Sequence, residues 1–335
     1  MKSNILRAFC LLFAVCMAAS ACDSSPSIEE GAAQAPVLTV LAIGTADSGG
    51  TMYPVGSAIA QAVTACDNDI KINVSSSSGS MMNVRALAAG EIDLGLVSGD
   101  VAYAAANGKD EFTEPVQGLR AIAAIYPSVS NWIAPRSLGA AYVHDLQGGH
   151  IGVGPQGSTT ELSARIAIET LGLAQSGILL DNCSLSTGAQ KVIDGQLDAL
   201  HAFTGVPVVG LSDLANALSC RVLKYTDDEL DLILAQNVFY YKTSIPKGTY
   251  AGQMEDVSTF GVKCLLCVDE SMEEELVYSI TQALWDSRAA LQKTHASMSS
   301  MEKEGFMYNR LPIPLHKGAL RFYQDSGLLA SACPE

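Results

Sequence analysis

Short apolar runs alternate with amphipathic stretches along most of the chain beyond residue 36. The runs have the length of buried strands, and the stretches between them have the apolar spacing of helices. Runs that predict strands cover residues 37–43, 71–75, 92–97, 119–125, 151–153, 181–185, 199–203 and 257–268. Stretches that predict helices cover residues 57–64, 81–89, 141–146, 161–171, 189–195, 271–294, 296–303 and 317–327. Such alternation is typical of parallel sheets with crossover helices, so we expect an α/β fold.

Three of the predicted strands are followed by loops rich in Gly, Ser and Thr, each ahead of a predicted helix. These loops cover residues 44–51, 76–80 and 154–160. The first N–H groups of a helix lack partners within the helix, and the helix dipole is positive there, so such loops are suited to anions. We expect the first loop, in the segment IGTADSGGTMYPVG at 43–56, to be the centre of the binding site.

Two further predicted strands end at residues with polar side chains. One ends at Ser98, and the other ends at Tyr126. Because ligands of open α/β sheets bind at the carboxyl ends of strands, both side chains are candidates for the site. Tyr126 is either a wall of the site or an aromatic residue of the core, and the sequence does not decide between these.

The N-terminus has the features of a secretory signal peptide. Lys2 and Arg7 are its only charges, residues 8–19 are apolar, and the small residues of ASAC at 19–22 follow. An apolar run this short indicates a signal rather than a membrane span. We therefore expect a signal peptide at 1–21.

The four residues ending at Cys22 resemble a bacterial lipobox, with Ala19 at the position where Leu is usual. This resemblance implies that Cys22 is the lipidated N-terminus, and simple cleavage after Ala21 is the alternative. The following Asp23 resembles the signal that retains lipoproteins at the inner membrane. Residues 22–36 are polar, acidic and contain Pro, which predicts a flexible tether.

Composition limits the possible partners and the domain number. The formal net charge of −15 and the pI near 4.7 argue against nucleic acid, whose phosphates such a surface repels. Cleavage after residue 21 would leave 335 − 21 = 314 residues, which favours two domains. No later stretch reaches the ~18 uninterrupted apolar residues of a membrane span.

Six cysteines follow the predicted signal and the lipidation position: Cys66, Cys183, Cys220, Cys264, Cys267 and Cys333. An even number in an exported chain permits disulfides, and Cys183–Cys220 is the pair to test first. Cys264 and Cys267 lie three apart on one predicted strand, so they should face opposite sides and bind neither each other nor a shared metal. Buried free thiols are the alternative.

Seven segments in order resemble the TAXI family of extracytoplasmic solute-binding proteins, which serve TRAP-type secondary transporters. They are IGTADSGGTMYPVGSAIA (43–60), SGSMMNVRALAAGEIDLGLVSGDVAY (78–103), LRAIAAIYP (119–127), IGVGPQGSTTELSARIAIETLGL (151–173), GQLDALHAFTGVP (195–207), FYYKTSIPKGTYAGQMEDVSTFGV (239–262) and LPIPLHKGALRFYQDSG (311–327). The resemblance implies a type II periplasmic-binding-protein fold. Two doubly wound α/β domains, residues 37–130 with 245–335 and residues 131–244, would be joined by hinge strands with the ligand cleft between them.

The resemblance also implies which residues bind the ligand. From the first domain these are Thr45, Ser48, Gly49, Gly50, Thr51, Tyr53, Ser78, Gly79, Ser80, Asn83, Ser98 and Tyr126, and from the second domain Gly157, Ser158, Thr159, Thr160 and Thr204. Two facing sets of donors suit a solute with two anionic ends, and the resemblance implies a small carboxylate such as glutamate or a 2-oxo or dicarboxylic acid. The sequence departs from the family at Ser98, where Gln is common, and at Met52, where an aromatic is common.

Other functions find less support in the sequence. ADSGG at 46–50 resembles the segment around a trypsin-like nucleophile, but no His precedes His144, and no GxSxG or strand-linked GxGxxG occurs. We therefore expect no enzyme and no cofactor, and a hydrolase is disfavoured. The expected protein is a periplasmic monomer that delivers solute to fused TRAP membrane subunits. A membrane-anchored ligand sensor of the same fold is the alternative.

Overall fold

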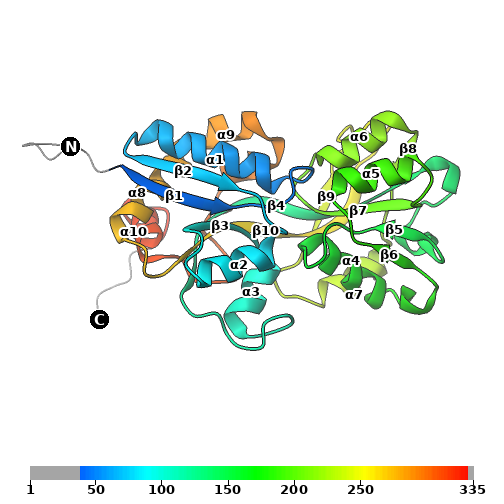
Figure 1. Ribbon diagram of the computed structural model, residues 1–335, viewed down its shortest axis with the longest axis horizontal. Coiled ribbons are helices and arrows are strands. Elements are labelled where there is room, and N and C mark those ends of the chain that lie inside the picture. The colour runs from blue at the N-terminus through cyan, green and yellow to red at the C-terminus, as the bar shows by residue number, and fades with distance from the viewer. Residues whose placement is uncertain (1–37, 331–335) are drawn as a thin grey trace, which may run out of the picture. The chain divides into compact units, whose positions relative to one another are not determined.

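The computed structural model describes residues 38–330 (Figure 1). The predicted signal peptide, the tether with Cys22 and the C-terminal Cys333 lie outside these residues. The chain order of the described elements alternates strands and helices, as the apolar pattern predicts.

One mixed sheet runs through the described residues, with strand order β2-β1-β3-β10-β4-β7-β5-β6, β9 beside β10 and β8 beside β4. Its strands are β1 (Thr39–Gly44), β2 (Ile70–Ser75), β3 (Leu94–Ser98), β4 (Leu119–Pro135), β5 (His150–Gly152), β6 (Leu179–Asp181), β7 (Ala199–Thr204), β8 (Cys220–Val222), β9 (Tyr241–Ile245) and β10 (Val257–Asp269). The pairs β1–β2, β1–β3, β5–β6 and β5–β7 are parallel, whereas β4 and β10 are antiparallel to each other.

The helices are α1 (Met52–Cys66), α2 (Ser80–Ala88), α3 (Gly99–Asn107), α4 (Thr159–Thr170), α5 (Leu185–Ile193), α6 (Val209–Ala217), α7 (Asp227–Leu234), α8 (Glu274–Asp286), α9 (Arg288–Thr294) and α10 (Lys317–Asp325). Four short 3₁₀ segments are η1 (Arg136–Leu138), η2 (Val143–Leu146), η3 (Leu173–Gln175) and η4 (Ala296–Glu302). Most of the predicted strands are confirmed to within two residues at each end, but the strand predicted at 119–125 continues to Pro135 as β4. The strand predicted at 181–185 is wrong, because β6 ends at Asp181 and α5 begins at Leu185. The single helix predicted at 271–294 is wrong, because it breaks at Ser287 into α8 and α9.

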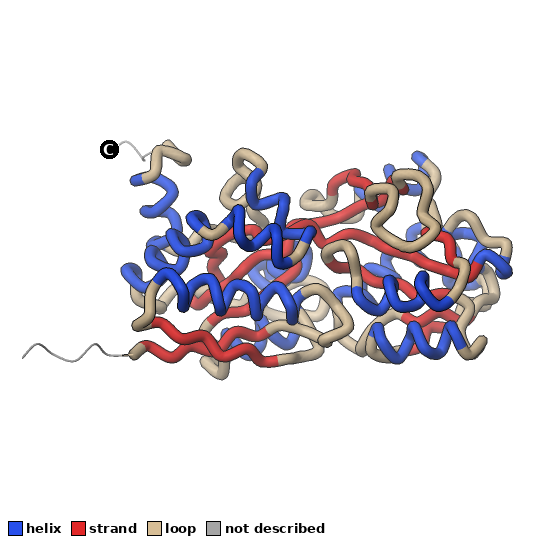
Figure 2. The backbone as a smooth tube through the Cα atoms, turned by 90° about the horizontal axis from the view of Figure 1, so that it is seen from above, coloured by secondary structure: helices blue, strands red, loops and turns tan. Residues whose placement is uncertain are grey.

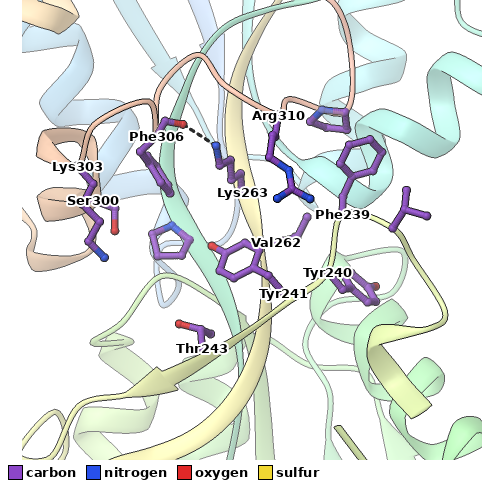
Figure 3. A pocket seen from close by; sticks show the side chains of 13 residues that line it. Phe239, Tyr240, Tyr241, Thr243, Val262, Lys263, Ser300, Lys303, Phe306 and Arg310 are labelled. Carbon is purple, nitrogen blue, oxygen red and sulfur yellow. Dashed lines mark hydrogen bonds between the residues drawn. The ribbon is translucent and has the colours of Figure 1, made fainter. Parts of the chain in front are cut away.

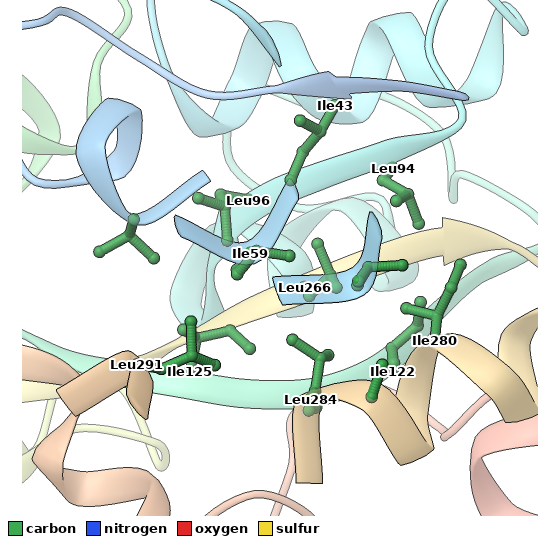
Figure 4. Close-up of a cluster of buried hydrophobic side chains, with 14 of the residues drawn as sticks. Ile43, Ile59, Leu94, Leu96, Ile122, Ile125, Leu266, Ile280, Leu284 and Leu291 are labelled. Carbon is green, nitrogen blue, oxygen red and sulfur yellow. The ribbon is translucent and has the colours of Figure 1, made fainter. Parts of the chain in front are cut away.

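Helices cover both faces of the sheet at each end (Figures 1 and 2). Apolar residues of α1, α8 and α10 pack against one face of β1 and β3, and those of α2 and α3 pack near β3 on the other. Around β7, α4 and α7 contribute to one cluster, and α5 and α6 contribute to another. Figure 4 shows the first of these clusters, in which Ile43, Ile59 and Leu266 pack together. The sheet is therefore doubly wound at both ends.

We call β1–β3 with α1–α3 and α8–α10 the first half, and β5–β8 with α4–α7 the second half. The strands β4 and β10 are long and extend from one half to the other, with β10 pairing both β3 and β4, and β4 also pairing β7. The predicted domain limits near residues 131 and 245 fall on β4 and at the end of β9. That the halves move as two domains stays a prediction.

The described cysteines are all free thiols, so the disulfide between Cys183 and Cys220 is wrong. Cys220 is instead buried against α6, where its thiol contacts the Leu214 carbonyl at 3.8 Å. Cys264 and Cys267 lie on β10 and belong to apolar clusters on opposite faces of the sheet, which confirms their predicted orientation. Burial raises the pKa of Cys264 to about 12, so this thiol stays protonated and unreactive at neutral pH.

Candidate functional site

The structure brings the three Gly, Ser and Thr loops around one cavity of about 40 Å³, which we call the cleft cavity. Its lining residues come from the loops before α1, α2 and α4, from the first residues of α1, α4 and α5, and from the end of β7. They are Ala46, Asp47, Gly50, Thr51, Met52, Ser78, Gly79, Pro155, Ser158, Thr159, Thr160, Leu185, Phe203 and Thr204. The starts of three helices from both halves therefore meet at one point, where their unpaired N–H groups and dipoles add.

The loop before α1 is hydrogen-bonded directly to the second half. Asp47 Oδ2 accepts from the Leu185 N–H at 3.0 Å, and Thr51 Oγ1 donates to the Gly205 carbonyl at 2.5 Å. The Gly210 N–H donates to the Gly49 carbonyl at 3.3 Å. Each bond contributes on the order of 0.5–1.5 kcal/mol, so together they hold the two walls of the cleft cavity closely together.

Close approach of the walls depends on Gly49. A Cβ atom at this position would lie 2.5 Å from Ser186 Oγ and 3.1 Å from the Ser186 backbone nitrogen, both of the second half. The second distance involves backbone and cannot be relieved by rotating a side chain. Gly49 therefore allows the halves to approach closely here, and a larger side chain would crowd Ser186.

The N-terminus of α4 is organised by its own side chains. Ser158 Oγ caps the helix by accepting from the Glu161 N–H at 3.2 Å, and Glu161 Oε2 accepts from the Gly157 N–H at 2.7 Å. Burial opposes the charge of Glu161, but hydrogen bonds from Arg165 and Gly157 outweigh it, so the pKa of Glu161 is lowered. No hydrogen bond among the described residues engages the backbone N–H groups of Thr159 and Thr160, which lie in the first turn and line the cavity.

The loop before α2 is held by Asn83, which does not line the cavity. Its amide donates to the carbonyls of Thr45 and Leu96, each at 2.8 Å, and its Oδ1 accepts from Ser77 Oγ at 2.7 Å. Thr45 in turn donates its hydroxyl to the Ser75 carbonyl at 2.7 Å. Asn83 and Thr45 therefore join the first two loops to each other, which is a positioning role.

Of the predicted site residues, the structure places Gly50, Thr51, Ser78, Gly79, Ser158, Thr159, Thr160 and Thr204 around the cleft cavity. The remaining ones, which do not line it, are Thr45, Ser48, Gly49, Tyr53, Ser80, Asn83, Ser98, Tyr126 and Gly157. Ser48 and Tyr53 are exposed, and Ser80 accepts from the Ser98 N–H at 2.9 Å in the interior. That the eight lining residues bind a solute stays a prediction.

Three buried hydroxyl groups near the crossing strands have no hydrogen-bond partner among the described residues, and they belong to Ser98, Tyr126 and Ser128. Burial raises the pKa of Tyr126 well above its usual value, while the nearby hydroxyls of Thr204 and Ser128 act in the opposite direction. Because Thr204 lines the cleft cavity, Tyr126 lies directly behind this lining. All three side chains are fully buried and none lines the cleft cavity, so the structure places Tyr126 in the core behind the cavity rather than in its wall.

The residues that sequence reasoning missed include Asp47, Leu185 and Phe203, which all line the cleft cavity. Asp47 stands inside the first Gly-rich loop, and an acidic residue at a predicted helix N-terminus would have pointed to it. Leu185 and Phe203 come from the second half, and the pattern of the chain gives no signal for them. Met52, named as a departure from the TAXI pattern, also lines the cavity.

The doubly wound halves, the two crossing strands and the cavity between the halves define the periplasmic-binding-protein fold. The structure is similar to MatC from Rhodopseudomonas palustris with bound malate, with a TM-score of 0.52 and 12% identity over 87% of this chain and 99% of that chain. It is also similar to the ligand-binding component of an ABC-type import system from Staphylococcus aureus with zinc bound, with a TM-score of 0.50 and 10% identity over 88% and 94% of the two chains.

The sequence places the chain more narrowly within this class. The chain belongs to the NMT1-like family, whose sequence profile matches residues 43–327. Within residues 38–330, no helix is long and apolar enough to cross a membrane, and no group of His, Cys, Asp and Glu side chains is arranged to hold a metal ion.

Proposed function

We propose that this protein is the extracytoplasmic solute receptor of a TAXI-type TRAP transporter, and that it captures a small carboxylate such as glutamate or a 2-oxo or dicarboxylic acid. The observation that carries the proposal is the meeting of three helix N-termini, from both halves, at the cleft cavity. A carboxylate with two ends can accept hydrogen bonds from both walls at once. The malate held by MatC makes a small dicarboxylate a sensible first ligand to test.

The cleft cavity would recognise the anion with backbone groups and hydroxyls. None of its lining residues is Lys or Arg, so a bidentate guanidinium clamp is not part of this proposal. Helix dipoles and fixed N–H groups supply a positive potential without the cost of burying a cation. Asp47 is the one acidic residue of the lining, and its carboxylate is already engaged by the Leu185 N–H.

Capture would require the halves to move. The cleft cavity of about 40 Å³ is far below the ~300–1,000 Å³ typical of small-molecule sites. Entry of a dicarboxylate would break the three hydrogen bonds from the loop before α1, with β4 and β10 bending as hinges. Closure around the bound solute would then restore contact between the walls.

A thermal-shift screen tests the proposal. The purified protein is heated with glutamate, 2-oxoglutarate and malate, and with glutamine, glucose and zinc chloride as comparisons. At least one of the acids should raise the melting temperature in a concentration-dependent way, with ~2.7 kcal/mol of stabilisation at a hundredfold excess over Kd. A shift with only sugars or metal ions would show that the anion proposal is wrong.

The proposed location follows from the N-terminal sequence, and the proposed partners follow from the resemblance to the TAXI family. The lipid anchor is tested separately. We propose that Cys22 is lipidated, that the protein is held at the inner membrane facing the periplasm, and that it works as a monomer with fused TRAP membrane subunits. Metabolic labelling with an alkyne fatty acid should mark the wild type and leave Cys22→Ser unmarked. Equal labelling of both proteins would rule out Cys22 as the lipid site.

A further inference from the structure

A second cavity, of about 350 Å³, lies beside the crossing strands and shares no lining residue with the cleft cavity (Figure 3). We call it the hinge pocket. Its lining residues are Pro127, Val238, Phe239, Tyr240, Tyr241, Thr243, Val262, Lys263, Ser300, Lys303, Phe306, Arg310 and Pro312. They come from β4, from β10, from the segment that leads into β9, and from the segment after α9. The volume is within the ~300–1,000 Å³ typical of small-molecule sites.

The hinge pocket is basic in a chain whose net charge is −15. Lys263, Lys303 and Arg310 line it, no lining residue is acidic, and none of the three cations forms an ion pair with a described residue. Burial, with the nearby charge of Arg310, lowers the pKa of Lys263 to about 8. Unpaired cations gathered in one hollow offer a binding site for an anion.

The positions of Lys263 and Arg310 are fixed by the local backbone. Lys263 Nζ donates to the carbonyls of Phe306 and Asn309, at 2.8 and 2.7 Å. The next residue, Arg310, has a φ of 49°, in the left-handed region that residues with a Cβ rarely occupy. Figure 3 shows Lys263 and Arg310 next to each other at the cavity. A backbone held in an unfavoured conformation beside an unpaired charge is typical of functional positions.

Aromatic residues form much of the remaining wall. Phe239, Tyr240, Tyr241 and Phe306 all line the pocket, and Lys263 Nζ lies 4.9 Å from the centre of the Phe306 ring. The hydroxyl of Tyr241 is buried without a hydrogen-bond partner among the described residues. The pocket therefore combines positive charge, flat apolar surface and one unsatisfied polar group, which are complementary to an organic anion with an apolar body.

We propose that the hinge pocket binds a small aromatic carboxylate, with the carboxylate between Lys263 and Arg310 and the ring against Phe239, Tyr241 and Phe306. The proposal does not depend on the function proposed for the cleft cavity. Its walls come from β9, β10 and the C-terminal segment, so the ligand would lie against the strands that connect the two halves.

Isothermal titration calorimetry with phenylacetate tests the proposal. Phenylacetamide has nearly the same shape without the charge, and acetate has the charge without the ring. We expect phenylacetate to bind at least tenfold more tightly than either of them. Equal affinity for phenylacetate and phenylacetamide would overturn the proposal, because the cations would then contribute nothing.

Substitutions of the cationic residues test whether phenylacetate binds in the hinge pocket. Arg310→Gln should weaken phenylacetate binding about tenfold or more, and it removes a side chain that makes no hydrogen bond among the described residues. Lys263→Met should weaken phenylacetate binding as well. If Lys263→Met disturbs the loop that Lys263 holds, the affinity of Arg310→Gln alone decides whether the cations of the hinge pocket bind the carboxylate. Lys71→Met, at an exposed lysine of β2 without an ion pair, is the matched control and should change nothing.

A last variant separates this proposal from the cleft. Gly49→Val should leave phenylacetate binding unchanged, since Gly49 is not part of the hinge pocket. If Gly49→Val abolished phenylacetate binding and Arg310→Gln did not, the aromatic carboxylate would be bound in the cleft cavity and the hinge pocket proposal would fail.

Discussion

The cleft cavity and the hinge pocket differ in how each could hold an anion. The cleft cavity is small, and its polar groups are backbone N–H groups and hydroxyls at helix starts. The hinge pocket is larger, and it offers Lys263, Lys303 and Arg310 among aromatic rings. Backbone donors are fixed by the helices that carry them, whereas long cationic side chains lose rotamer freedom when they bind. If both proposals hold, one acidic chain would present two chemically different anion sites, one built from backbone groups and one from cationic side chains.

The largest effect that separates the two sites should come from Gly49→Val. The added atoms would meet the Ser186 backbone, so the halves could no longer close. We expect affinity for the cleft solute to fall about 100-fold or more, because the closed state would be almost unpopulated. Equilibrium dialysis measures this, with Gln61→Ala at an exposed residue of α1 as the control. Unchanged solute affinity in Gly49→Val would show that closure of this loop on the second half is not needed.

The next predicted effect is a pH dependence of the unfolding free energy, and it comes from a buried histidine in the scaffold of the cleft. His201 of β7 is fully buried, its Nε2 lies 2.7 Å from Ser163 Oγ of α4, and it stacks on Trp132. Burial lowers the pKa of His201 to about 3, against about 6.5 in the unfolded chain. Below pH 6.5 the unfolded chain therefore binds a proton that the folded protein does not, and stability falls as pH falls towards 3.

This effect can be isolated by comparing two proteins. Between pH 7 and pH 5, wild type should lose about 2 kcal/mol of unfolding free energy through His201, and His201→Gln should lack this contribution. Urea unfolding at both pH values measures the difference, and the other titrating groups cancel between the proteins. Equal pH dependence in both proteins would mean that His201 takes up a proton in the folded protein over the same pH range as in the unfolded chain, so that its pKa is not lowered by burial.

Much of the scaffold around the cleft cavity could be predicted from the sequence because its signals are local. Apolar runs located most of the strands, although β8 and β9 were missed, and the Gly, Ser and Thr loops located three helix starts that the structure brings together. Helix α7 was missed although Thr226 and Glu229 form a capping box, with spacing that is visible in the sequence. Helix α3 was missed because it starts directly at the end of β3 without an intervening loop.

The hinge pocket could not be predicted, for a different physical reason. Lys263, Phe239 and Arg310 are separated by dozens of residues, and they meet only because β9 pairs with β10 and the C-terminal segment folds over both. Each residue alone is compatible with an ordinary strand or loop. The extension of β4 to Pro135 was also missed. Tyr126 and Pro127 suggested the end of a strand, but β4 continues through both residues towards the second half.

A smaller effect should come from one of the hydrogen bonds across the cleft. Thr51→Val keeps the shape of the side chain and removes the hydroxyl that donates to the Gly205 carbonyl. We expect solute affinity to fall about fivefold, equivalent to about 1 kcal/mol, because one buried hydrogen bond is lost from the closed state. Calorimetry with the solute found in the screen measures it, and Gln61→Ala at an exposed residue of α1 is the control. A change of less than twofold would mean that this bond does not favour closure.

The smallest effect, and the one that most directly compares the two sites, is their response to salt. Raising sodium chloride from 0.05 to 0.5 M shortens the screening length severalfold, and it should weaken phenylacetate binding at the half-buried Lys263 and the exposed Arg310 by a few fold. Binding in the cleft cavity should change less, because its donors are enclosed between the two halves and carry no net charge. Titrations of both ligands at the two salt concentrations provide the test. Equal salt dependence at both sites would show that the cleft, too, depends on charged side chains, and the distinction between backbone and side-chain recognition would then be wrong.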